Sequence, residues 1–327
     1  MMDVWDRKRD WRADLVPYLP PKAAALLGGV PDGAPLEEIR IRAEQPVQLC
    51  FAGGDRLLYG AGGRAPVTAD DCAAMLRRFC DQSLYAWEAE LRQCFLTLPG
   101  GYRVGLCGRM ETENGRPSAI CEAAAFNIRI AREVRGAAAA LMPRLVDACG
   151  RIRPTLLVSA PGAGKTTMLR DIARSASYGL YGARACRVAV ADTRYELAGS
   201  VRGVPQNDLG PRTDVLSGVG RADACRMLVK NMSPDLLVTD ELTTAADAEA
   251  VYEAACSGVS VVASAHAYSG DDLLRRRALL PLMQAQIFRR IVLLGRSRGA
   301  GTVEGVTDGL LRTLERRETL CCAHSRR

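Results

Sequence analysis

One stretch of the sequence, residues 156–173, limits the choice of fold more than any other. An apolar segment, residues 156–158, leads into a glycine-rich loop, and a segment with helical spacing of apolar residues follows. The loop comprises Ser159, Ala160, Pro161, Gly162, Ala163, Gly164, Lys165, Thr166 and Thr167. Backbone N–H groups of such a strand–loop–helix turn point inward and bind phosphate oxygens, assisted by the helix N-terminus. We therefore predict that residues 159–167 bind the phosphates of a nucleotide.

Individual residues of the loop indicate ATP and Mg²⁺ as the ligands. Gly162 and Gly164 allow the backbone angles and the close approach to phosphate that the loop needs. Lys165 is expected to reach the β- and γ-phosphates, and Thr166 to bind Mg²⁺. The first position of the loop is Ser159, where this pattern usually has glycine. Because Ser159 lies at the end of the strand, a small side chain is expected to serve there.

A second motif supports the same chemistry. The apolar residues 236–239 end in two carboxylates, Asp240 and Glu241. Asp240 is expected to contact the Mg²⁺ sphere and Glu241 to polarise the attacking water. Alone this pattern is weak, because many buried strands end in an acidic residue. Together the two motifs predict a P-loop ATPase with Lys165 and Glu241 as catalytic residues.

Two further candidates leave alternatives open. Asp192 and Glu196 follow another apolar segment and either form a second acidic cluster near the γ-phosphate or act as a helix N-cap and a solvated carboxylate. His266 follows the apolar residues 259–263 and either senses the γ-phosphate through a hydrogen bond or is a satisfied structural histidine. We carry Glu196 and His266 forward as candidate catalytic residues.

The spacing of apolar segments predicts an α/β fold with two domains. Short apolar strands alternate with helices in the second half, which is typical of a mainly parallel sheet covered on both faces. These strands are expected at residues 155–158, 187–190, 236–239, 259–263 and 291–294. In the first half, period-two segments, a glycine-rich turn and a capped helix after Thr68 predict a smaller α+β domain. An alanine-rich helix is expected at residues 137–149.

We place the domain boundary near residue 150. The expected segments are an N-terminal arm or cap (residues 1–35), an α+β N-terminal domain (36–150), a P-loop ATPase domain (151–315) and a charged tail (316–327). No apolar run approaches the roughly 18 residues that a membrane helix needs, and residues 1–10 carry no apolar signal segment. The sequence therefore predicts a cytoplasmic protein whose membrane role, if any, comes through partners.

Composition weighs against two function classes. The net charge of +7 permits weak attraction to nucleic acid, but aromatics are only 5% of the residues, so stacking platforms for single strands are scarce. The twelve cysteines include no CxxC pair, and the histidines are His266 and His324, so the paired ligands of a zinc site are absent. A nucleic-acid-binding ATPase nevertheless stays open as an alternative.

Several segments in order along the chain resemble the stage III sporulation protein AA family. They are residues 37–42, 101–105, 127–137, 159–167, 203–206, 212–216, 232–241 and 265–266. That family is similar to the ATPases of type II and type IV secretion and pilus systems. The resemblance implies a RecA-like core, a smaller N-terminal domain and a hexameric ring. It also implies ATP turnover that powers a membrane channel complex between mother cell and forespore, with this protein on the mother-cell side.

The resemblance also assigns residues. Lys165, Thr166, Asp240 and Glu241 match the family's ATP site, and His266 matches its histidine box. Asp192, Arg194 and Glu196 fall in a strand-terminal acidic segment of the family, where Thr193 replaces an expected Glu. That replacement keeps open a third hypothesis, a nucleotide-gated scaffold that hydrolyses ATP slowly.

Arginines acting on a neighbouring subunit's nucleotide are a further expectation, because a guanidinium stabilises charge on the transferring phosphoryl group. Arg129 and Arg132 precede the ATPase domain and are the candidates by resemblance to the secretion ATPases. Arg212 lies in a loop of the ATPase domain. Each of the three is by itself better explained as a surface arginine than as a trans-acting one.

Overall fold

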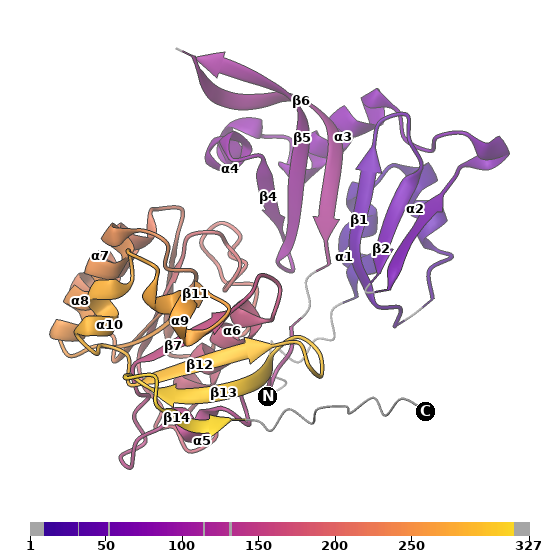
Figure 1. Cartoon of the computed structure of the whole chain (residues 1–327). Coiled ribbons are helices and arrows are strands. Elements are labelled where there is room, and N and C mark those ends of the chain that lie inside the picture. Colours follow the sequence, from indigo (N-terminus) through magenta and orange to yellow (C-terminus); the bar gives the residue numbers. More distant parts are fainter. Residues whose placement is uncertain (1–9, 32, 52, 114, 131–132, 317–327) are drawn as a thin grey trace, which may run out of the picture. The chain divides into compact units, whose positions relative to one another are not determined.

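The computed structural model describes residues 10–31, 33–51, 53–113, 115–130 and 133–316 (Figure 1). The chain forms two compact units. The first comprises residues 1–132 together with 199–207, and the second comprises residues 133–198 and 208–327. The first crossing between units therefore lies earlier than the boundary expected near residue 150, and one short segment of the expected ATPase domain belongs to the first unit.

The first unit is α+β, as the sequence predicts. In its described residues a six-stranded antiparallel sheet has the order β3-β2-β1-β6-β5-β4 (Figure 1). The strands are β1 (Leu36–Arg42), β2 (Val47–Phe51), β3 (Gly54–Leu58), β4 (Phe95–Leu98), β5 (Tyr102–Glu113) and β6 (Arg116–Arg129). The helices are α1 (Trp11–Leu15), η1 (Val16–Tyr18), α2 (Pro21–Leu27), η2 (Ala61–Gly63), α3 (Ala69–Phe79), η3 (Leu84–Trp87) and α4 (Glu88–Arg92).

A helix cap and the buried leucines of the N-terminal segment help to form this unit. Thr68 and Asp71 form the reciprocal capping box that starts α3, as predicted. Leu15, Leu19 and Leu27, from the segment expected to form an arm or cap, are buried in the same core as the sheet. That segment is therefore built into the first unit.

Residues 199–207 join the first unit through side-chain contacts. Val201 packs against the unit's hydrophobic core. The side-chain oxygen of Gln206 accepts a hydrogen bond from the N–H of Gly100 at 3.0 Å, and Arg202 pairs with Asp81 at 2.6 Å. The chain thus leaves the second unit after Ala198 and re-enters it at residue 208.

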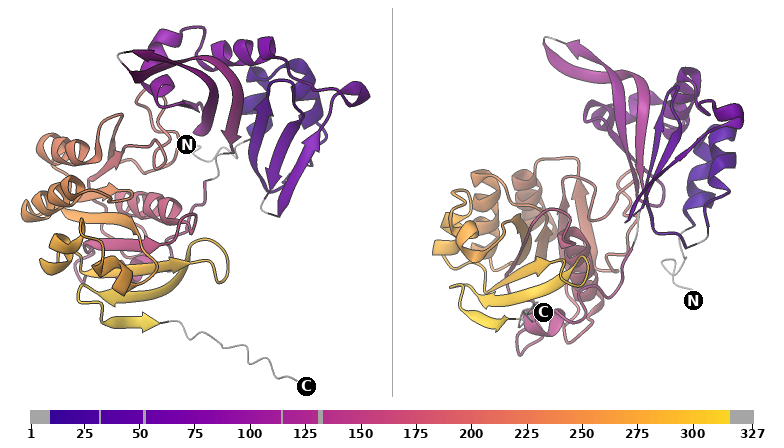
Figure 2. Two further views of the ribbon diagram at one scale, coloured as in Figure 1. Left: turned by 45° about the horizontal axis from the view of Figure 1, so that its top comes forward. Right: turned by 45° about the vertical axis from the view of Figure 1, so that its right-hand side comes forward.

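The second unit has the predicted mainly parallel sheet. Its eight strands, counted over the described residues, have the order β14-β13-β12-β7-β11-β10-β8-β9. Figure 2 shows this unit from two further directions, with its C-terminal strands in yellow. The six from β12 to β9 are parallel to one another, and β13 and β14 add antiparallel pairs at one edge. The strands are β7 (Thr155–Ser159), β8 (Val188–Asp192), β9 (Thr213–Ser217), β10 (Leu236–Thr239), β11 (Ser260–His266), β12 (Arg290–Gly295), β13 (Thr302–Asp308) and β14 (Thr313–Arg316).

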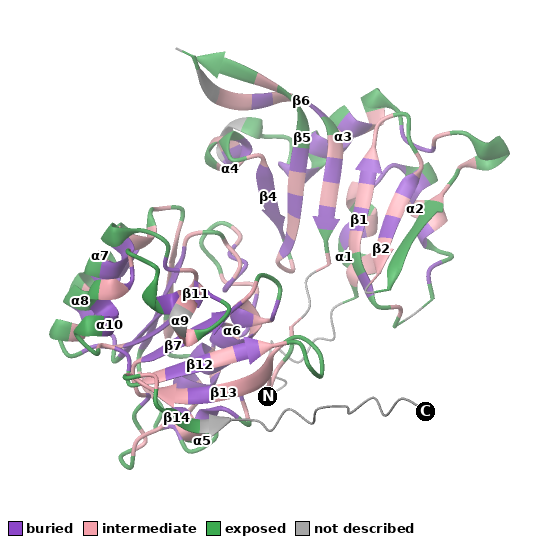
Figure 3. Ribbon diagram, in the orientation of Figure 1, coloured by how far each residue is buried: buried purple, intermediate pink, exposed green. Residues whose placement is uncertain are grey.

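Helices cover both faces of this sheet. Alternate residues of one strand enter different cores: Leu237 packs on the face of α7 and α8, whereas Leu236 and Val238 pack on the face of α6. Figure 3 shows the central strands buried along their length, as two covered faces require. The helices are α5 (Met142–Leu145), α6 (Lys165–Tyr178), α7 (Arg221–Met232), α8 (Ala245–Cys256), α9 (Gly270–Leu274) and α10 (Leu280–Gln284).

The expected helix at residues 137–149 is wrong in extent. Residues 135–141 form turns, and the helix is limited to α5. The carboxylate of Asp171, on α6, accepts the N–H groups of Gly136 and Ala138, and Pro143 supplies no N–H for a helical bond. Leu141 and Leu145 are buried in the core around α6. Tertiary contacts therefore tie this stretch to the second unit.

Candidate nucleotide-binding site

The glycine-rich loop lies between β7 and α6, where the sequence predicts it. The strand ends at Ser159 and the helix begins at Lys165. Gly162 and Gly164 have φ values of 69° and 88°, in the left-handed region that side chains rarely adopt. These two glycines shape a turn that leads directly into the N-terminus of a 14-residue helix. Such a terminus presents backbone N–H groups and a positive dipole end to an anion.

Strand register brings the other predicted residues to this loop. β11 lies between β7 and β10 in the sheet, and His266 at its end pairs in register with Ser159. Thr239, the last residue of β10, pairs with Ala263, so Asp240 comes beside Ser264. Carboxyl ends of parallel strands meet at one edge of a sheet, which is where such folds bind ligands.

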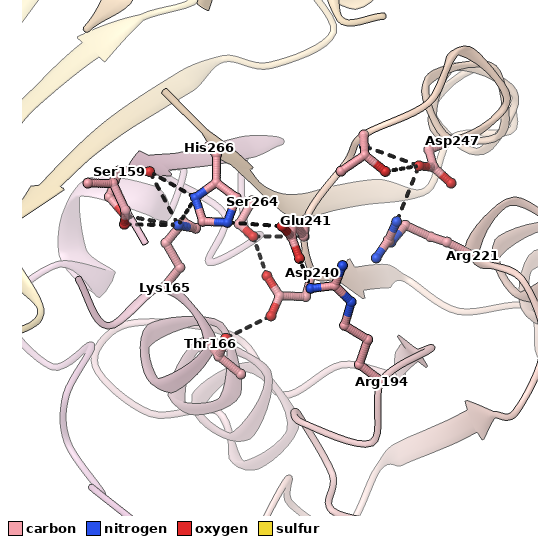
Figure 4. Close-up of polar contacts among 12 residues, drawn as sticks. Ser159, Lys165, Thr166, Arg194, Arg221, Asp240, Glu241, Asp247, Ser264 and His266 are labelled. Carbon is pink, nitrogen blue, oxygen red and sulfur yellow. Dashed lines mark hydrogen bonds and ion pairs between the residues drawn. The ribbon is translucent and has the colours of Figure 1, made fainter. Parts of the chain in front are cut away.

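Lys165 is buried in this cluster (Figure 4). Its Nζ lies 3.3 Å from the carbonyl oxygens of Ser159 and Ala160, 3.1 Å from Ser159 Oγ and 3.0 Å from His266 Nδ1. Burial lowers the pKa of the Lys165 ammonium, although Asp240 and Glu241 act in the opposite direction. The ammonium therefore has uncharged oxygen and nitrogen partners and lies near two carboxylates.

Asp240 joins the loop to the sheet. Thr166 Oγ1 donates to Asp240 Oδ2 at 2.7 Å, and Ser264 Oγ donates to the other carboxylate oxygen (Figure 4). A hydroxyl and a carboxylate are the oxygen donors that Mg²⁺ prefers, and this ion is usually held by one or two protein ligands together with phosphates. The hydroxyl of Thr166 and the carboxylate of Asp240 therefore fit the predicted Mg²⁺. In the described part of the chain no group of three or more His, Cys, Asp or Glu residues could hold a metal ion.

Glu241 has a strained backbone and a fully engaged carboxylate. Its φ is 50°, uncommon for a residue with a side chain, and its N–H donates to Ser264 Oγ at 2.9 Å. One carboxylate oxygen lies 2.9 Å from His266 Nε2, and the other pairs with Arg194 (Figure 4). Glu241 is thus held between two cationic or hydrogen-donating side chains.

The contacts of His266 select one tautomer. Lys165 has only donors, so His266 Nδ1 must accept from it, and the ring proton then lies on Nε2 and points to Glu241. This assignment satisfies the two shorter contacts, whereas the third, from Nδ1 to the carbonyl oxygen of Ser159 at 3.3 Å, then has no hydrogen between its two acceptors. The histidine therefore connects the loop lysine to the strand-terminal carboxylate, a position compatible with the predicted sensor role.

Asp192 is placed differently from the carboxylates of β10. It is 2% exposed, and its two oxygens accept the N–H groups of Glu196, Leu197 and Ala198 at 2.9, 3.1 and 2.8 Å. Burial raises the pKa of Asp192, against the effect of these three N–H groups. The carboxylate caps backbone N–H groups, but residues 193–198 form turns and bends, so the expected helix N-cap is wrong in that no helix begins there.

Glu196 is held through its main chain. Its N–H donates to Asp192, and its carbonyl oxygen accepts from Arg170 on α6 at 2.7 Å. The contact from this segment to Glu241 comes from Arg194. Sequence reasoning did not single out Arg194 as a contact of Glu241, because nothing local distinguishes it from other arginines. Ser264 was missed for a similar reason: its role follows only from strand register.

The three candidate trans-acting arginines lie in different parts of the chain. Arg129, on β6 of the first unit, is exposed and lies 3.5 Å from Glu38. Arg132 lies outside the described residues. Arg212 donates from its guanidinium to the carbonyl of Ser177 at 2.9 Å, in the last turn of α6. Because α6 begins at Lys165, Arg212 is fixed at the opposite end of that helix from the loop.

The fold is that of the RecA-like ATPases of secretion and pilus systems. The ADP-bound pilus retraction motor PilT superposes with a TM-score of 0.54 at 15% identity, covering 84% of this chain and 78% of that one. The ATPase DotB of Yersinia pseudotuberculosis gives a TM-score of 0.54 at 14% identity, covering 84% and 76%. At these identities the likeness concerns the fold alone.

The chain belongs to the family described as sporulation stage III, protein AA, whose model matches residues 23–312. Stage III sporulation protein AA of Bacillus subtilis (strain 168) is 40% identical over 273 residues, 84% of this chain and 87% of that protein. SEEDLING PLASTID DEVELOPMENT 1 of Arabidopsis thaliana is 32% identical over 153 residues, 46% of this chain and 21% of that protein. No helix in the described ranges is both long and apolar enough to cross a membrane.

Proposed function

We propose that this protein is a Mg²⁺-dependent ATPase and the motor subunit of a secretion-like channel complex in endospore formation. The observation that carries the proposal is the convergence of Lys165, Thr166, Asp240, Glu241 and His266 at one edge of the sheet (Figure 4). Family membership supports the sporulation role. A cytoplasmic location beside a membrane, on the mother-cell side, belongs to the same proposal.

Phosphate binding uses groups that are already gathered. The amides of the loop and of the first turn of α6 face the β-phosphate position, and Lys165 reaches the β- and γ-phosphates. To do so its Nζ exchanges the carbonyl oxygens of Ser159 and Ala160 for phosphate oxygens. Burial disfavours the ammonium in the nucleotide-free protein, so an anionic partner stabilises it more than these neutral oxygens do.

Thr166 and Asp240 would hold Mg²⁺ through their hydroxyl and carboxylate oxygens. When bound, the ion neutralises charge on the β- and γ-phosphates. The hydrogen bond from Thr166 to Asp240 keeps the two oxygen atoms that would hold Mg²⁺ 2.7 Å apart. Ser264, bonded to the second oxygen of Asp240, fixes the orientation of the carboxylate.

Glu241 would orient and polarise the attacking water. Both of its oxygens are engaged, one by His266 and one by Arg194, so one contact must be released before water can be accepted. His266 contacts Lys165 and Glu241 at once and would report the arrival of the γ-phosphate from the first to the second. Glu196, the other predicted catalytic residue, lies in the adjoining segment, where its N–H and carbonyl bond to Asp192 and Arg170, and we assign it no step of the hydrolysis.

The motor role requires a homo-oligomer, and we propose a hexameric ring docked on membrane proteins of the channel complex. Arg129 then serves as the described candidate for a guanidinium that reaches a neighbouring subunit's nucleotide, with Arg132 and Arg212 as the other two. Against Arg212 stands its bond to Ser177.

A second candidate, a nucleotide-gated scaffold that turns over slowly, is favoured by one observation. Both oxygens of the Glu241 carboxylate are engaged, one by His266 and one by Arg194. In that case ATP binding, and not its hydrolysis, would be the working step.

The first experiment measures ADP and ATP binding by calorimetry and ATP turnover with and without Mg²⁺, using the full chain, Lys165→Ala and the exposed-lysine control Lys230→Ala. We expect binding and Mg²⁺-dependent turnover in the parent and the control, and loss of both in Lys165→Ala. Light scattering with ATP is expected to give a ring-sized species. Binding without turnover would support the scaffold, salt-sensitive stimulation by single-stranded DNA would support the nucleic-acid alternative, and no binding would overturn the proposal.

A further inference from the structure

A second element reaches the glycine-rich loop from outside the predicted motifs. Residues 296–301 form the turn between β12 and β13, and this turn lies against the loop. The guanidinium of Arg296 donates from Nε and from one terminal nitrogen to the carbonyl oxygen of Gly162, at 3.1 and 2.6 Å. The N–H of Gly301 donates to the carbonyl oxygen of Ala163 at 2.9 Å. Two successive loop carbonyls are therefore bound by one turn.

Binding these carbonyls also orients two amides. In a planar trans peptide the C=O and the following N–H point in opposite directions. Holding the carbonyl of Gly162 toward the turn therefore directs the N–H of Ala163 away from it. The carbonyl of Ala163 fixes the N–H of Gly164 in the same way. Neither amide donates to another protein atom within the described residues, which leaves both available to phosphate oxygens.

The contact is too close for side chains on the loop. A Cβ built on Gly162 would lie 2.4 Å from the guanidinium of Arg296, and a Cβ on Gly164 would lie 2.8 Å from the nitrogen of Gly301. Gly164 thus admits the backbone of the turn, and Gly162 leaves room for the guanidinium of Arg296.

The turn is held in shape by its own bonds. The N–H of Gly299 donates to the carbonyl of Arg296 at 3.0 Å, and Thr302 Oγ1 donates to the carbonyl of Gly299 at 2.8 Å. The N–H of Ser297 donates to Glu304 on β13 at 3.2 Å. Arg296 is consequently presented by a preformed support on the same sheet as the loop.

We propose that residues 296–301 are a positioning element for the phosphate-binding amides and that Arg296 is its positioning residue. The inference rests on the proposed nucleotide binding and adds a group outside the predicted ATP motifs. Arg296 acts here through the carbonyl of Gly162. Arg298, in the same turn, is also exposed, and no hydrogen bond from its guanidinium is present among the described contacts, which makes it a matched control.

The test is calorimetric ADP affinity of the full chain, Arg296→Ala, Arg296→Lys and Arg298→Ala. We expect about tenfold weaker binding in Arg296→Ala, the effect of losing a hydrogen bond from a charged donor. Arg296→Lys, which keeps one donor, should lie between it and the parent, and Arg298→Ala should stay within about twofold. Unfolding midpoints without nucleotide should agree among all four, because Arg296 is exposed.

Two results separate the possible failures. If the parent and Arg298→Ala bind ADP and Arg296→Ala binds within twofold of them, the positioning role is overturned while nucleotide binding stands. The positioning role is also overturned if Arg296→Ala loses affinity and at the same time unfolds at a lower midpoint without nucleotide, and if Arg296→Lys recovers neither. That result would assign Arg296 a structural role. If the parent does not bind ADP, the proposed function fails and the inference falls with it.

Discussion

The segments after β8 and β10 lie on adjacent strands of one sheet and carry similar acidic sequences, yet their carboxylates have different kinds of partner. Asp192, the last residue of β8, accepts hydrogen bonds from three backbone N–H groups of the turn that follows it. Asp240 and Glu241, after β10, give theirs to side chains of Thr166, Ser264 and neighbouring residues. A backbone amide inside a buried turn cannot leave its acceptor without unfolding the turn.

The side chains around Asp240 and Glu241 can change partners by rotation. Lys165, Arg194 and His266 each contact the cluster through a flexible or titratable group. This difference teaches that the hydrogen-bond partners of an acidic residue at a strand end indicate its role. Backbone partners indicate a structural role, and side-chain partners that can move indicate a catalytic or ligand-binding role. The following predictions, in order of expected effect, would break or sharpen that distinction.

Asp240→Asn should abolish tight Mg²⁺-ATP use while leaving the fold intact. Loss of a carboxylate donor is expected to raise the Mg²⁺ concentration for half-maximal turnover on the order of a hundredfold, the upper range even for outer partners of a metal. The measurement is a Mg²⁺ titration of turnover, with the ligand-free unfolding midpoint as control. An unchanged titration would contradict the assignment of Asp240.

Asp192→Ala should act on stability. Two buried amides and one part-buried amide lose their acceptor, at about 1 kcal/mol each, so we expect a loss of about 3 kcal/mol. In a unit of this size that lowers the thermal midpoint by roughly 10 °C. Calorimetry of the variant checks this value. A variant that melts like the parent but no longer hydrolyses ATP would place Asp192 with the chemical acids and break the comparison.

Asp247, in the first turn of α8, is a third acidic residue for this comparison, and its partners are again structural. Its carboxylate closes the capping box with Thr244 and lies 3.2 Å from Arg221. Burial alone would raise its pKa, but the N–H groups of Thr244 and Thr243 and the charge of Arg221 bring the pKa of Asp247 below its ordinary 3.8. The sign follows directly: the stabilisation is complete above that value and is lost as pH falls through the lower folded pKa.

We therefore expect Asp247→Asn to cost about 1 kcal/mol at pH 7, the same cost down to about pH 4, and progressively less as the pH falls below 3.8. Urea unfolding of parent and variant across this range measures the difference. A cost independent of pH would mean that the charge of Asp247 has no part in the cap.

Ser159→Gly should have the smallest effect. It restores the residue that the loop pattern usually has and removes both contacts of Ser159 Oγ. One is the bond donated to the carbonyl oxygen of the neighbouring Ala160 at 2.7 Å, and the other, which concerns the ligand, is the bond accepted from Lys165 Nζ at 3.1 Å. The loss of one weak hydrogen bond, about 0.5 kcal/mol, corresponds to roughly a twofold change in ATP affinity. Competition binding resolves such a change, and a tenfold effect would assign Ser159 a direct role.

Much of the second unit could be predicted from sequence because its strands are continuous apolar runs between helices. β7 and β10 begin and end within a residue of the expected limits. The ATP motifs are local, so Lys165, Thr166, Asp240 and Glu241 could be assigned by spacing. The antiparallel strands β13 and β14 were not anticipated, since β13 is mostly half-buried, Thr313 and Leu314 of β14 are exposed, and neither strand has a continuous apolar pattern.

The features that could not be predicted from the sequence depend on contacts between residues that are distant along the chain. Arg194 and Arg296 are two of many arginines, and only the fold brings them to Glu241 and Gly162. Residues 137–149 had helical composition, but the carboxylate of Asp171 bound their backbone in a turn. Residues 199–207 carry no signal that they belong to the first unit.

ATP turnover of Glu241→Gln beside Glu196→Gln tests the central claim most directly, because the two glutamates follow the two compared strands. Glu241→Gln should lower turnover by about a hundredfold or more, the usual contribution of a group that transfers or orients a proton, while ADP affinity is retained. Glu196→Gln should stay within about threefold of the parent, since the backbone of Glu196 makes the contacts that hold its turn. Equal losses in both variants, or a fully active Glu241→Gln, would contradict the account.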